Sequence, residues 1–151
     1  MALKLSTDFK NYILSRGIVA TIAGTTGTGG TAVIKIYSGA QPANADTAPS
    51  GTSGTMLCEI INIGWAKTTM GATSGTASLG TSVGYSGTAA ETGVAGWARF
   101  ETVGSGFSGS AATFRMDGDV GTGATCAFVI NSTELTNGGA VSLLTAPITL
   151  E

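Results

Sequence analysis

Hydrophobic and polar residues alternate over short stretches along most of this chain, which is the pattern of half-buried β-strands. Strand-like stretches rich in β-branched and aromatic residues occupy residues 32–38, 56–63, 95–102, 111–116, 124–131 and 140–150. The stretch at 56–63 is apolar on both faces apart from Glu59 and Asn62, which fits a central strand. Turn-forming residues separate the stretches at a spacing of roughly ten residues, which is typical of sandwiches and jelly rolls. The pattern therefore predicts an all-β fold, an antiparallel β-sandwich or jelly-roll-like domain.

Residues 1–17 are the exception, because their pattern predicts a short N-terminal helix. Leu5, Phe9 and Ile13 form an apolar stripe, and a glycine follows as a suitable C-terminal stop. A helix this short needs a packing partner, which is either its own sheet or a neighbouring subunit. We treat it as an N-terminal arm and residues 18–151 as a single β-sandwich domain.

Two long stretches inside the domain lack a clear strand pattern. Residues 39–51 contain Pro42 and Pro49 and are expected to form an extended loop. Residues 66–94 are a low-complexity mixture of Gly, Thr, Ser and Ala, which could form two weak strands or a mobile loop. Abundant threonine and regularly spaced glycine favour weak strands.

Turn signals and strand alternation together assign the C-terminal turns and the core. Asp117-Gly118 predicts a hairpin turn, and Asn137-Gly138-Gly139 predicts another turn. The expected core side chains are Leu57, Ile61, Phe100, Phe114, Phe128 and Ile130.

Composition argues against most catalytic chemistry. The chain has no histidine, so it has no Ser–His or Cys–His pair and no imidazole metal ligand. Charged residues make up 11% of the chain, less than half of the roughly 25% usual in globular domains. A surface this poor in charge suits a protein that neighbours cover. We expect a non-enzymatic protein that makes contacts.

The distribution of charged and apolar residues excludes two further classes of partner, nucleic acids and membranes. The formal net charge is −2 and the seven Lys and Arg residues are scattered, so no stripe for nucleic-acid phosphates is expected. No apolar run approaches the length of a membrane span. The N-terminus lacks the pattern of a signal peptide, so synthesis in a reducing cytoplasm is the default expectation. Cys58 and Cys126 are then expected to be buried thiols, with a disulfide less favoured.

Three short motifs suggest chemistry, but each has a simpler structural explanation. Residues 104–109 match G-x-G-x-x-G, yet a strand-like sequence follows where the dinucleotide motif needs a helix. Asp117 and Asp119 could attract a cation, but a hairpin turn explains the pair. Asn131-Ser132-Thr133 matches the glycosylation acceptor, although a strand end is the simpler interpretation. We expect no catalytic, cofactor-binding or metal-binding residues.

Three stretches resemble a family of small virion structural proteins of tailed bacteriophages and prophages. Residues 33–51 resemble its I-Y-S-G-x-Q-P-x-x-A-D-x-A-P-x-G segment, residues 88–100 its A-G-W-x-R-F strand, and residues 115–122 its R-x-D-G-x-V-G-T turn. They cover roughly a third of the chain and lie in the expected order. The resemblance implies a place in the virion, and it supplies no catalytic residues.

The leading expectation is a capsid decoration or cement protein that binds other virion proteins, above all the major capsid protein, as a homo-oligomer. The candidate interface residues are Leu5, Phe9, Ile13, Trp97 and Arg99. A neck, collar or tail component is the first alternative. A receptor- or carbohydrate-binding β module that uses Trp97 and Tyr85 is the second, although filling the core is the favoured interpretation of Trp97.

Overall fold

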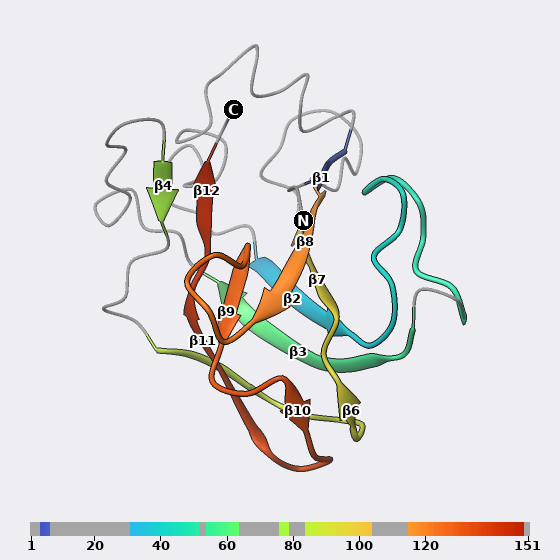
Figure 1. Cartoon of the computed structure of the whole chain (residues 1–151), viewed down its shortest axis with the longest axis vertical. Helices are drawn as coiled ribbons and strands as arrows, with labels where there is room; N and C mark the ends of the chain where they lie inside the picture. The colour runs from blue at the N-terminus through green and yellow to red at the C-terminus, as the bar shows by residue number, and fades with distance from the viewer. Residues whose placement is uncertain are drawn as a thin grey trace.

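In the described part of the computed structural model, every helix or strand of more than one residue is a β-strand, so the predicted all-β fold is confirmed. The structure describes residues 4–6, 31–51, 54–63, 76–78, 84–103 and 115–149. The strands are β1 (Lys4–Leu5), β2 (Thr31–Tyr37), β3 (Met56–Ile63), β4 (Thr76–Ser78), β5 (Tyr85–Thr88), β6 (Gly93–Val94), β7 (Trp97–Val103), β8 (Arg115–Gly121), β9 (Phe128–Ile130), β10 (Glu134–Leu135), β11 (Ala140–Thr145) and β12 (Pro147–Thr149). Figure 1 shows their arrangement.

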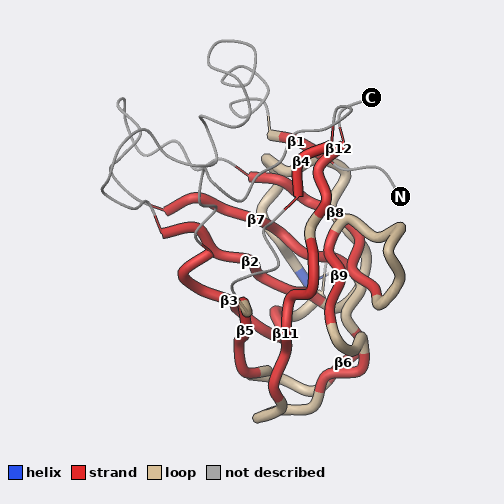
Figure 2. The backbone as a smooth tube through the Cα atoms, turned by 90° about the vertical axis from the view of Figure 1, so that its left-hand side faces the viewer, coloured by secondary structure: helices blue, strands red, loops and turns tan. Residues whose placement is uncertain are grey.

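One mostly antiparallel sheet dominates the fold and curves nearly into a barrel (Figure 2). Its strand order is β3-β2-β7-β8-β9-β11-β5, and β1 pairs with β8 beside this path. The two end strands approach each other at a single bridge between Cys58 and Ala89, where the Ala90 amide also donates to the Leu57 carbonyl over 2.8 Å. Opposite walls of this curved sheet therefore supply the two packed layers expected of a sandwich.

The core fills the inside of the curved sheet with side chains from all of its long strands. Predicted core residues Leu57, Phe100, Phe128 and Ile130 are at most 2% exposed, which confirms those assignments. Phe114 lies outside the described residues. Because large side chains from β3, β7 and β9 meet here, burial of apolar area holds the barrel walls together.

The assignment of Ile61 to the core is wrong, because its side chain is 55% exposed. The cause lies in the pairing of β3 with β2. Between the pairs Ala32–Ile63 and Ile34–Ile60, β3 has one more residue than β2, which is the pattern of a β-bulge. A second bulge leaves Leu57 unpaired between the partners of Ile36 and Tyr37. A bulge changes which residues of a strand point into the core, and it increases the curvature of the strand. The alternation of hydrophobic and polar residues does not reveal where a bulge lies.

Two predictions about the C-terminal third are also corrected. Asp117 and Gly118 do not form a hairpin turn but lie inside β8, where Gly118 pairs with Ala98 of β7. The strand expected at 124–131 is shorter, since β9 begins at Phe128 after a loop. β9 runs parallel to β8, and only the last two residues of β8 pair with it. The strands are thus offset, so a short loop suffices where fully aligned parallel strands need a long crossover.

The remaining predicted elements fall partly inside the described chain. The strands at 32–38 and 56–63, the loop at 39–51 and the turn around Gly138 are confirmed. Within 66–94, where two weak strands were favoured over a loop, the described residues form three short strands, β4, β5 and β6. Of the arm at 1–17, the described Lys4–Leu5 is an extended strand paired with β8. Leu5 therefore does not belong to the predicted helical stripe, and apart from Ser6 the rest of the arm lies outside the described residues.

Candidate functional site

The outer face of β2, β7 and β8 carries an unusual share of the charge in this chain. Residues in register across these strands form rows, and every second residue points outward. Together with β3, these strands contribute seven of the sixteen charged residues (7 Lys and Arg plus 9 Asp and Glu). They are Lys35, Glu59, Arg99, Glu101, Arg115, Asp117 and Asp119. The face is therefore a charged patch in a charge-poor chain.

An ion pair between Arg99 and Asp117 lies at the centre of this face. Arg99 Nε donates to Asp117 Oδ1 and Arg99 Nη2 to Asp117 Oδ2, each over 2.7 Å. The two residues are register partners on β7 and β8, and they are 1% and 0% exposed. A bidentate pair of this kind is the strong, geometrically specific form of the salt bridge. Burial lowers the pKa of Arg99, but the hydrogen bond and charge of Asp117 outweigh it, so the net shift is upward and the side chain stays cationic.

Two stacked aromatic rings extend the site toward the end of β2. Tyr37 and Trp97 lie with ring centroids 4.4 Å apart and an interplanar angle of 11°. The guanidinium carbon of Arg99 lies 5.5 Å from the centroid of Trp97, within range of a cation–π contact. Burial, followed by the charge of Glu101, raises the pKa of Tyr37. Its hydroxyl group therefore stays protonated near neutral pH.

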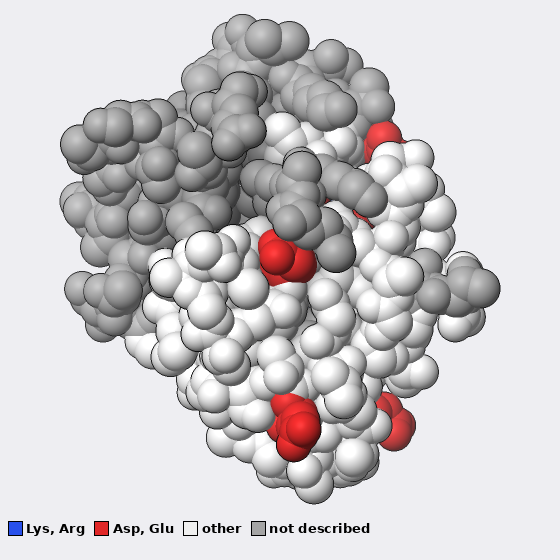
Figure 3. All heavy atoms as spheres, in the orientation of Figure 1, with Lys and Arg blue, Asp and Glu red and all other residues white. Residues whose placement is uncertain are grey.

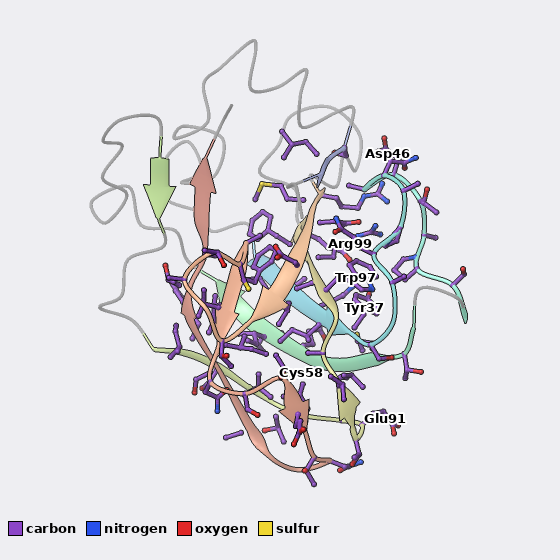
Figure 4. All side chains as sticks on the ribbon, viewed as in Figure 1. Tyr37, Asp46, Cys58, Glu91, Trp97 and Arg99 are labelled. Atoms are coloured by element: carbon purple, nitrogen blue, oxygen red, sulfur yellow. The ribbon has the colours of Figure 1, made fainter. Side chains whose placement is uncertain are left out.

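Residues 38–51 and 54–55, which we call the clamped loop, contact this ion pair. Arg99 Nη2, besides contacting Asp117, donates to the backbone oxygen of Thr47 at 2.9 Å. The guanidinium group therefore joins two strands and the loop at one point. Figure 4 shows Tyr37, Trp97 and Arg99 in succession beneath the loop, with Asp46 at its tip.

Local structure fixes the shape of the clamped loop at its tip and at its base. At the tip, the Asn44 side-chain oxygen accepts hydrogen bonds from the amides of Asp46 and Thr47, at 3.0 and 2.9 Å. At the base, the Ser38 amide donates to the Thr55 carbonyl and the Thr55 amide donates to Ser38 Oγ, both at 3.0 Å. The contacts of Asn44 are those of an Asx turn, and the contacts between Ser38 and Thr55 hold the two ends of the loop together. Both restrict the conformation of the loop backbone.

Glycine is required where the clamped loop returns to β3. Gly54 has a φ of +89°, and a Cβ at this position would overlap the carbonyl oxygen of Ser38. A side chain would therefore be strained by its backbone conformation and would also push the two ends of the loop apart.

The predicted interface residues lie in different parts of the molecule. Leu5 is half-buried and packs against the core, whereas Phe9 and Ile13 lie outside the described residues. Trp97 and Arg99 lie side by side as predicted from strand alternation, but both are buried, and Arg99 donates to the loop backbone at Thr47. Neither ring nor guanidinium is therefore presented to a partner directly, and Arg99 acts on the surface through the loop that it contacts.

The aromatic residues weighed as a sugar platform do not present a ring to solvent. Trp97 is fully buried, as favoured from the sequence, and Tyr85 is 8% exposed and packs in the core. A sugar-binding platform needs an accessible aromatic face. These two residues do not supply one.

The polar motifs that suggested chemistry serve structural roles in the described chain. Asp117 binds Arg99, and Asp119 accepts a hydrogen bond from the Ala127 amide at 2.9 Å, which fixes the loop before β9. Asn131 bridges to β11, with its side-chain oxygen accepting from the Ser142 amide at 2.9 Å. The glycine motif at 104–109 lies outside the described residues.

The cysteines are free thiols, as favoured from the sequence. Cys58 is buried, and burial followed by the charge of Glu59 raises its pKa, which disfavours the nucleophilic thiolate. Cys126 is only half-buried, so the expectation of burial holds fully for Cys58 alone of the two. Neither forms a disulfide.

Sequence reasoning missed three members of the site, namely Tyr37, Thr47 and Asp117. The ion pair could have been predicted, because Arg99 and Asp117 carry opposite charges and each lies in a stretch with the alternation of a β-strand. Reading Asp117-Gly118 as a turn concealed it. The contact of Thr47 comes from its backbone oxygen, so its side chain carries no signal.

Within the described residues, no three His, Cys, Asp or Glu side chains are grouped to hold a metal ion. The same part of the chain contains no helix that is long and apolar enough to cross a membrane. No protein-family model, curated protein or solved structure matches the chain. The clamped loop and the ion pair that it contacts are therefore the candidate functional site.

Proposed function

We propose that this chain is a non-enzymatic structural protein of a tailed-bacteriophage virion. One observation carries the proposal. The three segments that resemble the virion family meet in one structural unit, since 33–51 supplies the clamped loop, 88–100 supplies Arg99 and 115–122 supplies Asp117. Segments that are far apart in the chain but cooperate in one feature support a family-level resemblance over a chance one.

The protonation of the described side chains supports a non-enzymatic role. Burial is the main cause that raises the pKa values of Tyr37, Cys58 and Tyr85. These groups stay protonated near pH 7, so they are poor general bases and poor nucleophiles. The strongest polar contact in the site, between Arg99 and Asp117, positions a loop.

We place the protein on the head surface, as a capsid decoration or cement protein that binds the major capsid protein in many copies. The exposed surface supports this role. Figure 3 shows isolated acidic side chains on an otherwise uncharged face, with no described Lys or Arg visible on it. A surface with few charges loses little solvation when a neighbour covers it. A protein that binds only the assembled shell stabilises it by mass action.

Purified particles of the virus or prophage that encodes the chain provide the test. Electron microscopy of particles labelled with an antibody against this protein should show label over the head. Quantitative mass spectrometry should give on the order of hundreds of copies per particle, because decoration follows the symmetry of the shell. About a dozen copies, with label at the neck or tail, would overturn the placement on the head. Absence of the protein from the particles would overturn the virion role itself.

A further inference from the structure

One edge of β8 is completed by the N-terminal strand. A strand inside a sheet has two hydrogen-bonding edges, and one edge of β8 pairs with β7. On the second edge, β9 pairs with Val120 and Gly121, and β1 pairs with Met116 and Asp117. Among the described strands, β1 alone covers this middle part of the second edge.

The contacts of β1 show that this position accepts a specific short segment. Lys4 pairs with Asp117 and Leu5 with Met116, and the Ser6 amide donates to the Arg115 carbonyl at 3.1 Å. Leu5 packs against the core and Ser6 is 1% exposed. Removing β1 would leave a sheet edge open directly beside the buried Asp117. Such an edge is a template for another strand.

The chain between β1 and β2 contains enough residues for β1 to reach another copy. Ser6 lies beside Arg115, and Thr31 pairs with Val103 on β7. Three strand spacings and two residues along the strands separate these points, which amounts to roughly 16 Å. The 24 residues from 7 to 30 join them, and a chain of that length can span up to about 80 Å.

We propose that β1 is exchanged between copies of this chain, so that Lys4–Leu5 of one copy pairs with β8 of another. The occupant is a second copy because it brings the same Leu5 and Ser6 in the same register. Exchange of an identical element replaces each lost contact with an equal one, so it is a low-cost route to association. The proposal concerns copies of this chain alone and holds independently of the virion role.

Disulfide trapping between two variants provides the test. Leu5→Cys is placed on one copy and Met116→Cys on another, both with Cys58→Ala and Cys126→Ser. Register partners have Cβ atoms roughly 5 Å apart, close to the distance that a disulfide needs. The two proteins are mixed at high concentration, oxidised, and separated on a non-reducing gel. We expect a cross-linked heterodimer whose yield rises with protein concentration.

Two control reactions make every outcome decisive. Leu5→Cys mixed with Glu91→Cys, an exposed position far from β8 (Figure 4), should cross-link roughly tenfold less, because proximity raises the effective concentration of the matched pair. A chain that carries both Leu5→Cys and Met116→Cys should close its own disulfide when dilute. If it does so and the mixed pair yields no more dimer than the Glu91 control, exchange is excluded. If it does not, the pairing on which the proposal rests is wrong.

Discussion

Two faces of the same curved sheet differ in where their charged side chains lie. The face of β2, β7 and β8 buries Arg99 and Asp117 beneath the clamped loop. The outward residues of β3, β5 and β11, which we call the open face, include Ile61 and Leu144, at 55% and 52% exposed. The first face uses buried charge to fasten a loop, and the second leaves Ile61 and Leu144 in solvent beside the exposed Glu59. Among the described residues, the two buried charges fasten a loop, whereas the open face leaves apolar side chains available for contacts.

Removing one partner of the buried ion pair should have the largest effect. Asp117→Ala leaves the Arg99 guanidinium buried without its carboxylate, which should lower the free energy of unfolding by about 3–5 kcal/mol. Urea denaturation followed by circular dichroism measures it. A loss below about 1 kcal/mol would mean that water reaches Arg99 and that the clamped face is not closed.

The glycine at the base of the clamped loop should tolerate substitution less than a glycine in a distant turn. Gly54 and Gly138 both have a positive φ, at +89° and +82°. A Cβ on Gly54 overlaps the Ser38 carbonyl, whereas one on Gly138 meets nothing within 4 Å. We expect Gly138→Ala to cost about 1 kcal/mol and Gly54→Ala about twice that. Equal losses of melting temperature would show that the loop end moves freely to accept the side chain.

Alkaline pH should weaken the clamped face through Tyr37. Burial, and then the charge of Glu101, raises its pKa above the 10.0 of a free tyrosine. Above that pH the unfolded chain releases a proton that the folded chain retains, so stability is fully present below it and falls as the pH rises further. Tyr37→Phe removes the hydroxyl group and keeps the ring stack. The free energy of unfolding, measured from pH 7 upward, should therefore decline less steeply in this variant than in the wild type.

Substitutions on the open face should have the smallest effect. Ile61→Ser and Leu144→Ser replace exposed side chains, so the free energy of unfolding should change by no more than about 0.5 kcal/mol. The matched comparison is Phe128→Ala, which empties a core position and should cost about 3–5 kcal/mol. A large loss for Ile61→Ser in thermal denaturation would show that the open face is covered in the folded protein.

Much of the strand pattern is predictable from the sequence because alternation reports which side of a strand is buried. It identified the ranges of β2 and β3 and the buried positions of Phe100 and Phe128. It failed at Ile61, because a bulge depends on pairing with another strand and leaves no local signature. Local patterns report the neighbours along a strand and not the register across it.

The candidate site was only partly predictable, for a related reason. Trp97 and Arg99 were singled out as adjacent on one face, and they do lie together. The role of Asp117 was missed, since Asp-Gly is a strong turn signal that tertiary pairing with Arg99 overrides here. The loop contact through the Thr47 backbone oxygen depends on folding at long range, which sequence patterns do not encode.

Amide hydrogen exchange in the double variant Arg99→Met/Asp117→Leu tests the central claim, that the buried charges fasten the loop. Apolar replacement of both partners should preserve the fold, because it leaves no charge buried. Without the Arg99 contact to Thr47, the amides of Asp46 and Thr47 should exchange roughly tenfold faster, as local opening becomes easier. The amides of Gly138 and Gly139, which are bonded in the distant turn, should keep their protection. Unchanged exchange at Asp46 and Thr47 would contradict the account, because the loop would then be held by something other than the ion pair.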